Sequence, residues 1–170
     1  MKSPVSSFRA CFMALGLTLT LVACGGSSDP ETLVREGNTE LGSGNGSAAL
    51  AKFDAALEAV EPTAETWMDA KLGRIEALIF VDAPRAKSEF LELARTRESD
   101  VDESKFVEFG GKMSSEKKFD QAIDVLDAGV QRFGKESAKL MAALDKVKRD
   151  ATAAGASEAL NKLSGLGYTN

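Results

Sequence analysis

The sequence predicts an all-α fold, built as a stack of about three helix-turn-helix hairpins with a C-terminal capping helix. Apolar residues recur three and four positions apart, as in Leu50, Phe53, Leu57 and Val60, which is the period of an amphipathic helix. No segment shows the sustained alternation of a half-buried strand. A group of small and large residues also recurs three times along the chain at nearly constant spacing, as expected of repeated hairpins.

The first predicted hairpin spans about residues 30–62. Asp29-Pro30-Glu31 offers an N-cap, a proline at the first helical position and an acid where the helix dipole favours negative charge. The apolar residues from Leu50 to Val60 form the face of its second helix. These signals predict one helix starting at Pro30 and a second one before residue 62.

Two more hairpins are predicted over residues 63–98 and 99–134. Thr63 is the expected cap of the second hairpin, and Asp100 with Glu103 resembles a capping box in aspartate form. Apolar residues with helical spacing fill both segments, which closes the predicted three-hairpin region at residue 134.

Residues 135–170 continue as helix without the small-and-large pattern. A stack of hairpins leaves an apolar end that a more polar helix must cover. We expect a capping helix at 136–150, a break at 151–156 and a short last helix at about 157–164. The tail that follows either packs back onto the stack or frays.

Three sets of residues stand in phase, 36 or 37 positions apart. Glycine or alanine allows two helix backbones to approach, while a large side chain fills the groove between neighbouring helices. We therefore assign these residues a structural role in each hairpin. They are Gly37, Gly73 and Gly110, then Ala49, Ala86 and Ala122, then Phe53, Phe90 and Leu126.

This pattern resembles the tetratricopeptide repeat (TPR), which has small residues in both helices and a large apolar residue in the second. The resemblance covers about residues 30–134, with a period longer than usual and without the closing proline after the second and third units. It implies three TPR-like repeats whose first helices line a concave face that takes peptides. The alternative is a non-repetitive helical bundle with accidental phasing.

The same resemblance implies which residues of the first helices face a partner. We expect a partner-binding surface on the first and second hairpins, although the carboxylate clamp of one TPR subgroup is not supported, because Glu108 would repel a carboxylate. Trp67 is either a core or partly covered surface residue, or a ligand-stacking residue. The expected partner-binding residues are Asn38, Leu41, Lys71, Ile75 and Trp67.

The N-terminus predicts export and lipidation. Two basic residues and no acid precede the apolar run Ala10–Ala23, whose 14 residues are too short to span a bilayer. Leu-Val-Ala before Cys24 resembles the lipobox of bacterial lipoproteins, which implies removal of residues 1–23, acylation of Cys24 and a flexible tether over 24–29. Gly25 then favours the periplasmic face of the outer membrane in a Gram-negative host. An ordinary signal peptide with a chance cysteine is the alternative.

Composition excludes several function classes. The first 23 residues hold two of the 21 basic residues and none of the 26 acids, so the remaining chain has a formal net charge of −7. Nucleic acid is therefore not an expected partner. The chain contains no histidine, the commonest general base and metal ligand, and no nucleophile or phosphate-loop motif. We expect no catalysis, no cofactor and no metal.

Two functions remain open from the sequence. The first is a lipid-anchored scaffold or adaptor that binds a protein or peptide at the bacterial envelope. The second is a small-molecule or glycan-binding lipoprotein with a pocket near Trp67.

Overall fold

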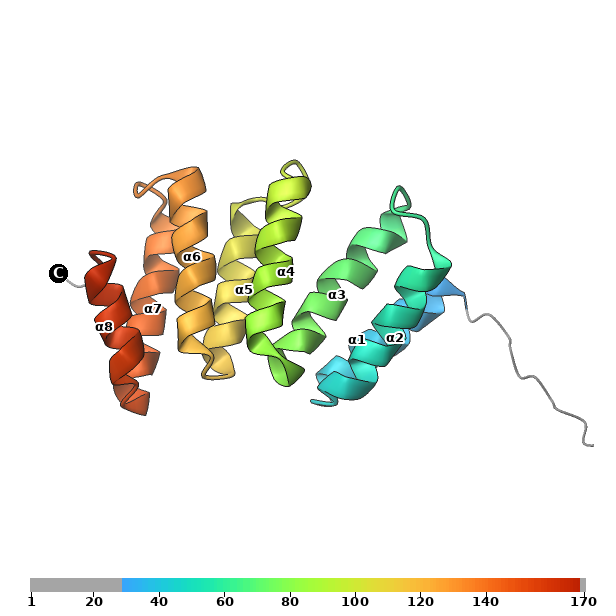
Figure 1. The fold of residues 1–170 in the computed structure, drawn as a ribbon, viewed down its shortest axis with the longest axis horizontal. Helices are drawn as coiled ribbons and strands as arrows, with labels where there is room; N and C mark the ends of the chain where they lie inside the picture. Colours follow the sequence, from blue (N-terminus) through green and yellow to red (C-terminus); the bar gives the residue numbers. More distant parts are fainter. Residues whose placement is uncertain (1–28, 169–170) are drawn as a thin grey trace, which may run out of the picture.

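The computed structural model describes residues 29–168, and the expected signal peptide, Cys24 and residues 25–28 of the tether lie outside this range. Within it the chain is all-helical, with eight α-helices and no strand. The helices follow one another in a row (Figure 1). They are α1 (Pro30–Gly42), α2 (Gly46–Ala59), α3 (Glu65–Val81), α4 (Ala83–Thr96), α5 (Glu103–Ser115), α6 (Phe119–Phe133), α7 (Ala138–Ala154) and α8 (Ser157–Gly165).

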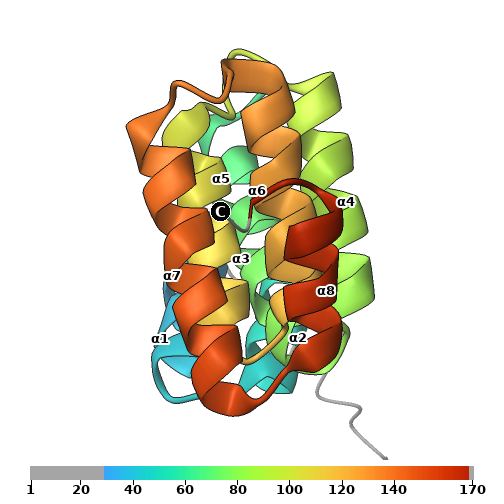
Figure 2. The same cartoon turned by 90° about the vertical axis from the view of Figure 1, so that its left-hand side faces the viewer.

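The helices form two layers. Figure 2 shows α1, α3, α5 and α7 on one side and α2, α4, α6 and α8 on the other. Contacts run along each layer, from α1 to α3, α5 and α7 and from α4 to α6 and α8, and also across the layers, as between α2 and α3. One face of the described molecule is therefore made by the odd-numbered helices alone.

The helix ends follow from local capping, with two departures from expectation. Asp29 caps α1 by accepting a hydrogen bond from the Thr32 backbone N–H at 3.1 Å. Asp102, not Asp100, caps α5, because the Asp100 N–H is bonded to the Arg97 carbonyl in the turn that ends α4. Thr63 caps nothing, since the Glu61 carbonyl accepts from the Ala64 N–H and the resulting turn delays the start of α3 to Glu65.

The C-terminal part is longer and more ordered than expected. Helix α7 runs on to Ala154 instead of residue 150 and stops where Gly155 adopts a left-handed conformation with φ 68°. The break before α8 is therefore only two residues long. The tail packs back onto the molecule, because Tyr168 is buried and its hydroxyl donates a hydrogen bond to Asp127 of α6 at 2.7 Å.

The in-phase glycines receive the large side chains of neighbouring helices. A Cβ atom at Gly37 would lie 2.7 Å from Phe53 Cζ, and a Cβ atom at Gly73 would collide with the same ring from the other side. Phe53 of α2 is thus held between the backbones of α1 and α3. In the third hairpin, a Cβ atom at Gly110 would lie 2.6 Å from Leu126 Cγ.

The other in-phase residues lie in the core. Phe90 of α4 stacks on Phe109 of α5 and meets Phe106 edge-on, with ring centroids 4.6 and 5.2 Å apart. This aromatic cluster joins the second helix of one hairpin to the first helix of the next. The three alanines Ala49, Ala86 and Ala122 are fully buried.

Polar contacts between hairpins recur with almost the same sequence separation. Arg97 donates to the Pro62 carbonyl, and one hairpin further on Arg132 donates to the Ala94 and Glu98 carbonyls, over separations of 34 to 38 residues. Lys87 pairs with Asp124 over 37 residues. Residues 34 to 38 positions apart are therefore bonded to one another at several places along the described chain.

Candidate functional site

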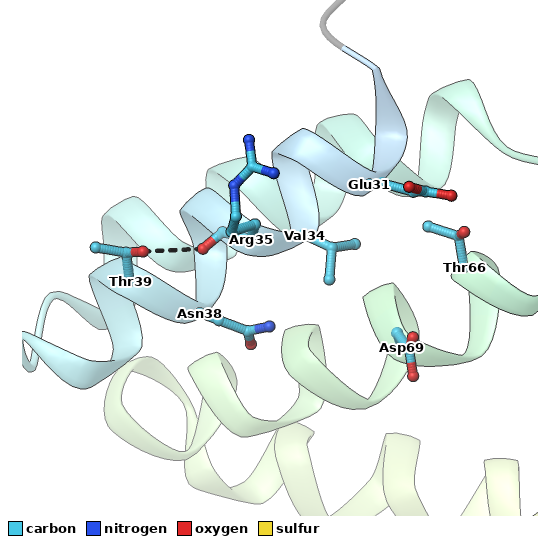
Figure 3. Close-up of a pocket in the computed structure, with 7 residues that line it drawn as sticks. All are labelled: Glu31, Val34, Arg35, Asn38, Thr39, Thr66 and Asp69. Carbon is cyan, nitrogen blue, oxygen red and sulfur yellow. Dashed lines mark hydrogen bonds between the residues drawn. The ribbon is translucent and has the colours of Figure 1, made fainter.

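Two grooves open on the face of the odd-numbered helices. The first, the α1–α3 groove, has a volume of about 550 Å³ and is drawn in Figure 3. Its lining residues are Glu31, Val34, Arg35, Asn38, Thr39, Thr66 and Asp69. The second, the α3–α5–α7 groove, has a volume of about 500 Å³. Its lining residues are Glu76, Ile79, Phe80, Val107, Glu108, Gly111, Lys112, Ser115, Glu116 and Lys146.

The α1–α3 groove is lined by polar side chains, two of them acidic, around Val34. Val34 and Asn38 point from α1 toward α3, whereas the Arg35 guanidinium points away from α3 (Figure 3). Arg35 instead donates a hydrogen bond to Thr32 of its own helix at 3.3 Å. Glu31 and Asp69 form no ion pair among the described residues. This groove therefore offers carboxylate and amide groups to a ligand.

The α3–α5–α7 groove has an apolar wall and a charged rim. Phe80 is 40% exposed, one of the three large apolar side chains that the described part of the chain exposes, and it borders the groove with half-buried Val107. Gly111 adds no side chain, and nothing lies within 4 Å of where its Cβ would be. An apolar side chain of a ligand therefore has space and apolar contacts here.

The cations on this rim are already paired. Lys112 donates to Glu76 at 2.5 Å and to Glu108 at 2.9 Å, and Glu108 also accepts from Lys105. Burial opposes the charge of Lys112, but the two carboxylates outweigh this effect and raise its pKa. Burial likewise opposes the charge of Glu108, yet its hydrogen bonds to the two lysines lower its pKa. Lys112 and Glu108 therefore stay charged at neutral pH, and each is paired within this cluster.

The second cation that lines this groove, Lys146, is also paired, whereas one of its acids is not. Lys146 of α7 pairs with Asp150 at 2.6 Å. Glu116, just past the end of α5, is exposed and forms no ion pair among residues 29–168. The charge that this groove leaves uncompensated is therefore negative.

The structure places the expected partner-binding residues in different environments, and only some of them lie at a surface groove. Asn38 lines the α1–α3 groove and is exposed. Ile75 is fully buried in the core, which excludes it from a binding surface. Lys71 also belongs elsewhere, because its ammonium is bonded to Glu89 of α4, in the other layer, at 2.8 Å. Leu41 is half-buried against the α1–α2 core and lines neither groove.

Trp67 borders a separate cavity of about 350 Å³ at the start of α3. The Arg97 guanidinium lies over its ring at 5.0 Å from the centroid and donates to the Pro62 carbonyl at 2.7 Å. One face of the indole is thus covered by a side chain of the protein itself.

Sequence reasoning missed Phe80, Asp69 and Glu116. A signal for Phe80 was present, because residues 77–81 read Ala-Leu-Ile-Phe-Val and five consecutive apolar residues cannot all face inward on one helix. Asp69 and Glu116 carry no such signal, since an acid on a helix surface is ordinary.

Comparison of the chain with protein-family models, curated protein sequences and solved structures found no match. Among the helices within residues 29–168, none is long and apolar enough to cross a membrane.

Proposed function

We propose that this chain is an exported, lipid-anchored scaffold that binds a protein or peptide partner at the bacterial envelope and performs no catalysis. The observation that carries the proposal is the pair of grooves on the face of the odd-numbered helices. Both are lined by helix side chains from different hairpins, which is the arrangement expected for binding an extended partner across a stack.

The TPR-like reading of the fold belongs to the same proposal. Its support is the three-fold recurrence of small and large residues, together with inter-hairpin bonds 34 to 38 residues apart. In this reading α1–α2, α3–α4 and α5–α6 are the three repeats, and α7 with α8 covers the end of the stack.

The anchor is proposed from the sequence. The run before Cys24 resembles a lipobox, and acyl chains on this cysteine would hold the chain at a membrane surface, with Gly25 favouring the outer membrane of a Gram-negative host. Asp29 begins α1 five residues after Cys24, so at about 3.3–3.6 Å per residue the tether holds the first hairpin within about 18 Å of the acylated residue.

The alternative, a small-molecule or glycan site near Trp67, has less support. Stacking of a sugar or aromatic ligand needs a free ring face, and Arg97 already lies over the indole. The nearby cavity is also smaller than either groove on the odd-numbered face.

The proposal is tested by capture of a partner from detergent-solubilised envelope of the host. Asn38→Trp fills the α1–α3 groove from an exposed position. The matched control is Asn161→Trp, at an exposed position of α8 outside both grooves. We expect a stoichiometric protein with the wild type and with Asn161→Trp, and its loss with Asn38→Trp. Equal capture by both variants would move the binding surface elsewhere, and stabilisation by a metabolite without any protein partner would favour the alternative.

A further inference from the structure

The two grooves differ in chemistry, and this difference constrains what can fill them. The α1–α3 groove presents Glu31 and Asp69 without cationic partners among the described residues, around the exposed amide of Asn38. The α3–α5–α7 groove presents Phe80 and Val107. One groove therefore suits a cation and the other an apolar side chain.

The charge balance of the residues that line the two grooves points the same way. The two grooves together hold five carboxylates against three cationic side chains. Of these cations, Lys112 is bonded to two carboxylates and Lys146 to Asp150, while Arg35 points away from α3. An acidic segment would meet uncompensated like charge here, whereas a basic one would meet Glu31, Asp69 and Glu116.

The distance between the grooves follows from α3, which lines both. Asp69 in the first groove and Ile79 in the second are ten positions apart on this helix, or about 15 Å along its axis. An extended chain covers that distance in about five residues.

We propose that the partner is an extended segment that places an apolar side chain in the α3–α5–α7 groove and a lysine or arginine, about five residues away, in the α1–α3 groove. This inference rests on the proposed function and names the chemistry of its partner. The apolar anchor gains contact with Phe80 and Val107, and the cation gains Asp69 and Glu31.

Synthetic peptides test the proposal on the protein without its signal. The probe is Gly-Ser-Phe-Ser-Gly-Ser-Gly-Arg-Ser-Gly, and the comparison peptides replace its arginine by glutamate or its phenylalanine by serine. An NMR titration to millimolar peptide reports both the affinity and the amides that shift. We expect shifts in α1, α3 and α5 with the probe and at least five-fold weaker binding of either comparison peptide.

A protein variant then identifies the cation site. Asp69 is exposed and forms no ion pair among the described residues, so Asp69→Asn leaves the fold intact. This variant is expected to weaken binding of the arginine probe about five-fold and to strengthen binding of the glutamate peptide, because it removes a like charge from the groove. The matched control is Glu58→Gln, which removes an exposed carboxylate from α2, outside both grooves.

Two results would overturn the proposal. Equal binding of the arginine and glutamate peptides in the same grooves would remove the charge preference while leaving a peptide-binding face in place. If no amide shifts at peptide concentrations up to millimolar, the protein does not bind a segment with these two side chains. Neither result touches the capture experiment with Asn38→Trp, so failure of this inference and failure of the proposed function are distinguishable.

Discussion

Two adjacent glycines in α5 have opposite environments. At Gly110 the backbone touches Leu126 of α6, whereas the space beside Gly111 is open. Glycine at Gly110 is therefore required by packing, but at Gly111 it only lowers the intrinsic stability of the helix.

We predict opposite effects from the same substitution at these two positions. Gly110→Ala should lower the free energy of unfolding by about 1–3 kcal/mol, because its Cβ would lie 2.6 Å from Leu126 Cγ. Gly111→Ala should raise it by about 0.5–1 kcal/mol through helix propensity. Urea denaturation of the two variants measures both values, and a stabilising Gly110→Ala would show that α5 and α6 do not pack as described.

Glu89 connects the two layers through charge. It accepts hydrogen bonds from Lys71 and Arg74 of α3, and Arg74 also bonds Asp54 of α2. Burial raises the pKa of Glu89, but these two cations outweigh it and lower the pKa from 4.5 to about 2. A carboxylate with a lowered pKa stabilises the folded state above its unfolded pKa, and this contribution disappears as pH falls through its folded pKa.

The contribution of Glu89 to stability should therefore be complete above about pH 4.5 and vanish toward pH 2. Glu89→Gln is expected to cost up to about 3 kcal/mol at pH 7, with a difference from wild type that shrinks across this window. Thermal melts from pH 7 to pH 2 follow it. The control is Glu58→Gln, which removes an exposed carboxylate that forms no ion pair among the described residues. A loss of stability in Glu89→Gln that does not depend on pH would contradict this role of Glu89.

At the scale of the element, α2, α4 and α6 each carry one of the in-phase alanines in a buried position. Ala49, Ala86 and Ala122 have no exposed surface, although they lie on helices with exposed residues on the opposite side. Their in-phase spacing therefore marks buried positions in three different helices.

Enlarging one of these alanines should separate its helix from its neighbours. Ala122→Leu is expected to lower the free energy of unfolding by about 1–3 kcal/mol, because the surrounding core has no room for the added atoms. Gln131→Leu, at an exposed position of the same helix, should change it by no more than about 0.5 kcal/mol. Thermal denaturation compares the two, and equal small shifts would mean that the phased alanines carry no structural role.

At the scale of the whole molecule, the C-terminal tail packs against the last helices of the row. Tyr168 packs into the core beside α6 and α8 and bonds Asp127, and burial followed by this bond raises the pKa of its hydroxyl. The tail thus fixes the C-terminal end of the row against α6 and α8.

The proposed anchor predicts where the molecule is found. Cys24→Ser should release the protein from the membrane fraction. Each buried CH₂ of an acyl chain contributes about 0.8 kcal/mol to membrane binding, and no described helix can replace the acyl chains as an anchor. Cys11→Ser changes the other cysteine, within the expected signal peptide, and should leave the protein membrane-bound. Carbonate extraction followed by immunoblotting separates the outcomes. Carbonate-resistant membrane association of Cys24→Ser would refute lipid anchoring at this residue.

The sequence by itself determined the all-helical class, because the spacing of apolar residues and the position of a proline set helix formation within a few residues of the chain. Asp29 caps α1 as expected. The cap of α5 is Asp102 and not the expected Asp100, because Asp100 belongs to the turn that follows α4. The in-phase glycines meet large side chains, but spacing alone did not predict which ones, because Gly73 meets Phe53 of α2 and not Phe90 of its own hairpin.

Only the tertiary structure decided which residues of the expected binding surface are exposed and which line the grooves. Ile75 and Lys71 lie on a predicted binding helix, yet one is core and the other is bound to α4. Helix α3 has neighbours on several sides, so its apolar residues define no single face, and exposure depends on how the other helices cover it. For the same reason the two grooves have no signature in local sequence, because residues of α3 line one of them together with α1 and the other together with α5 and α7.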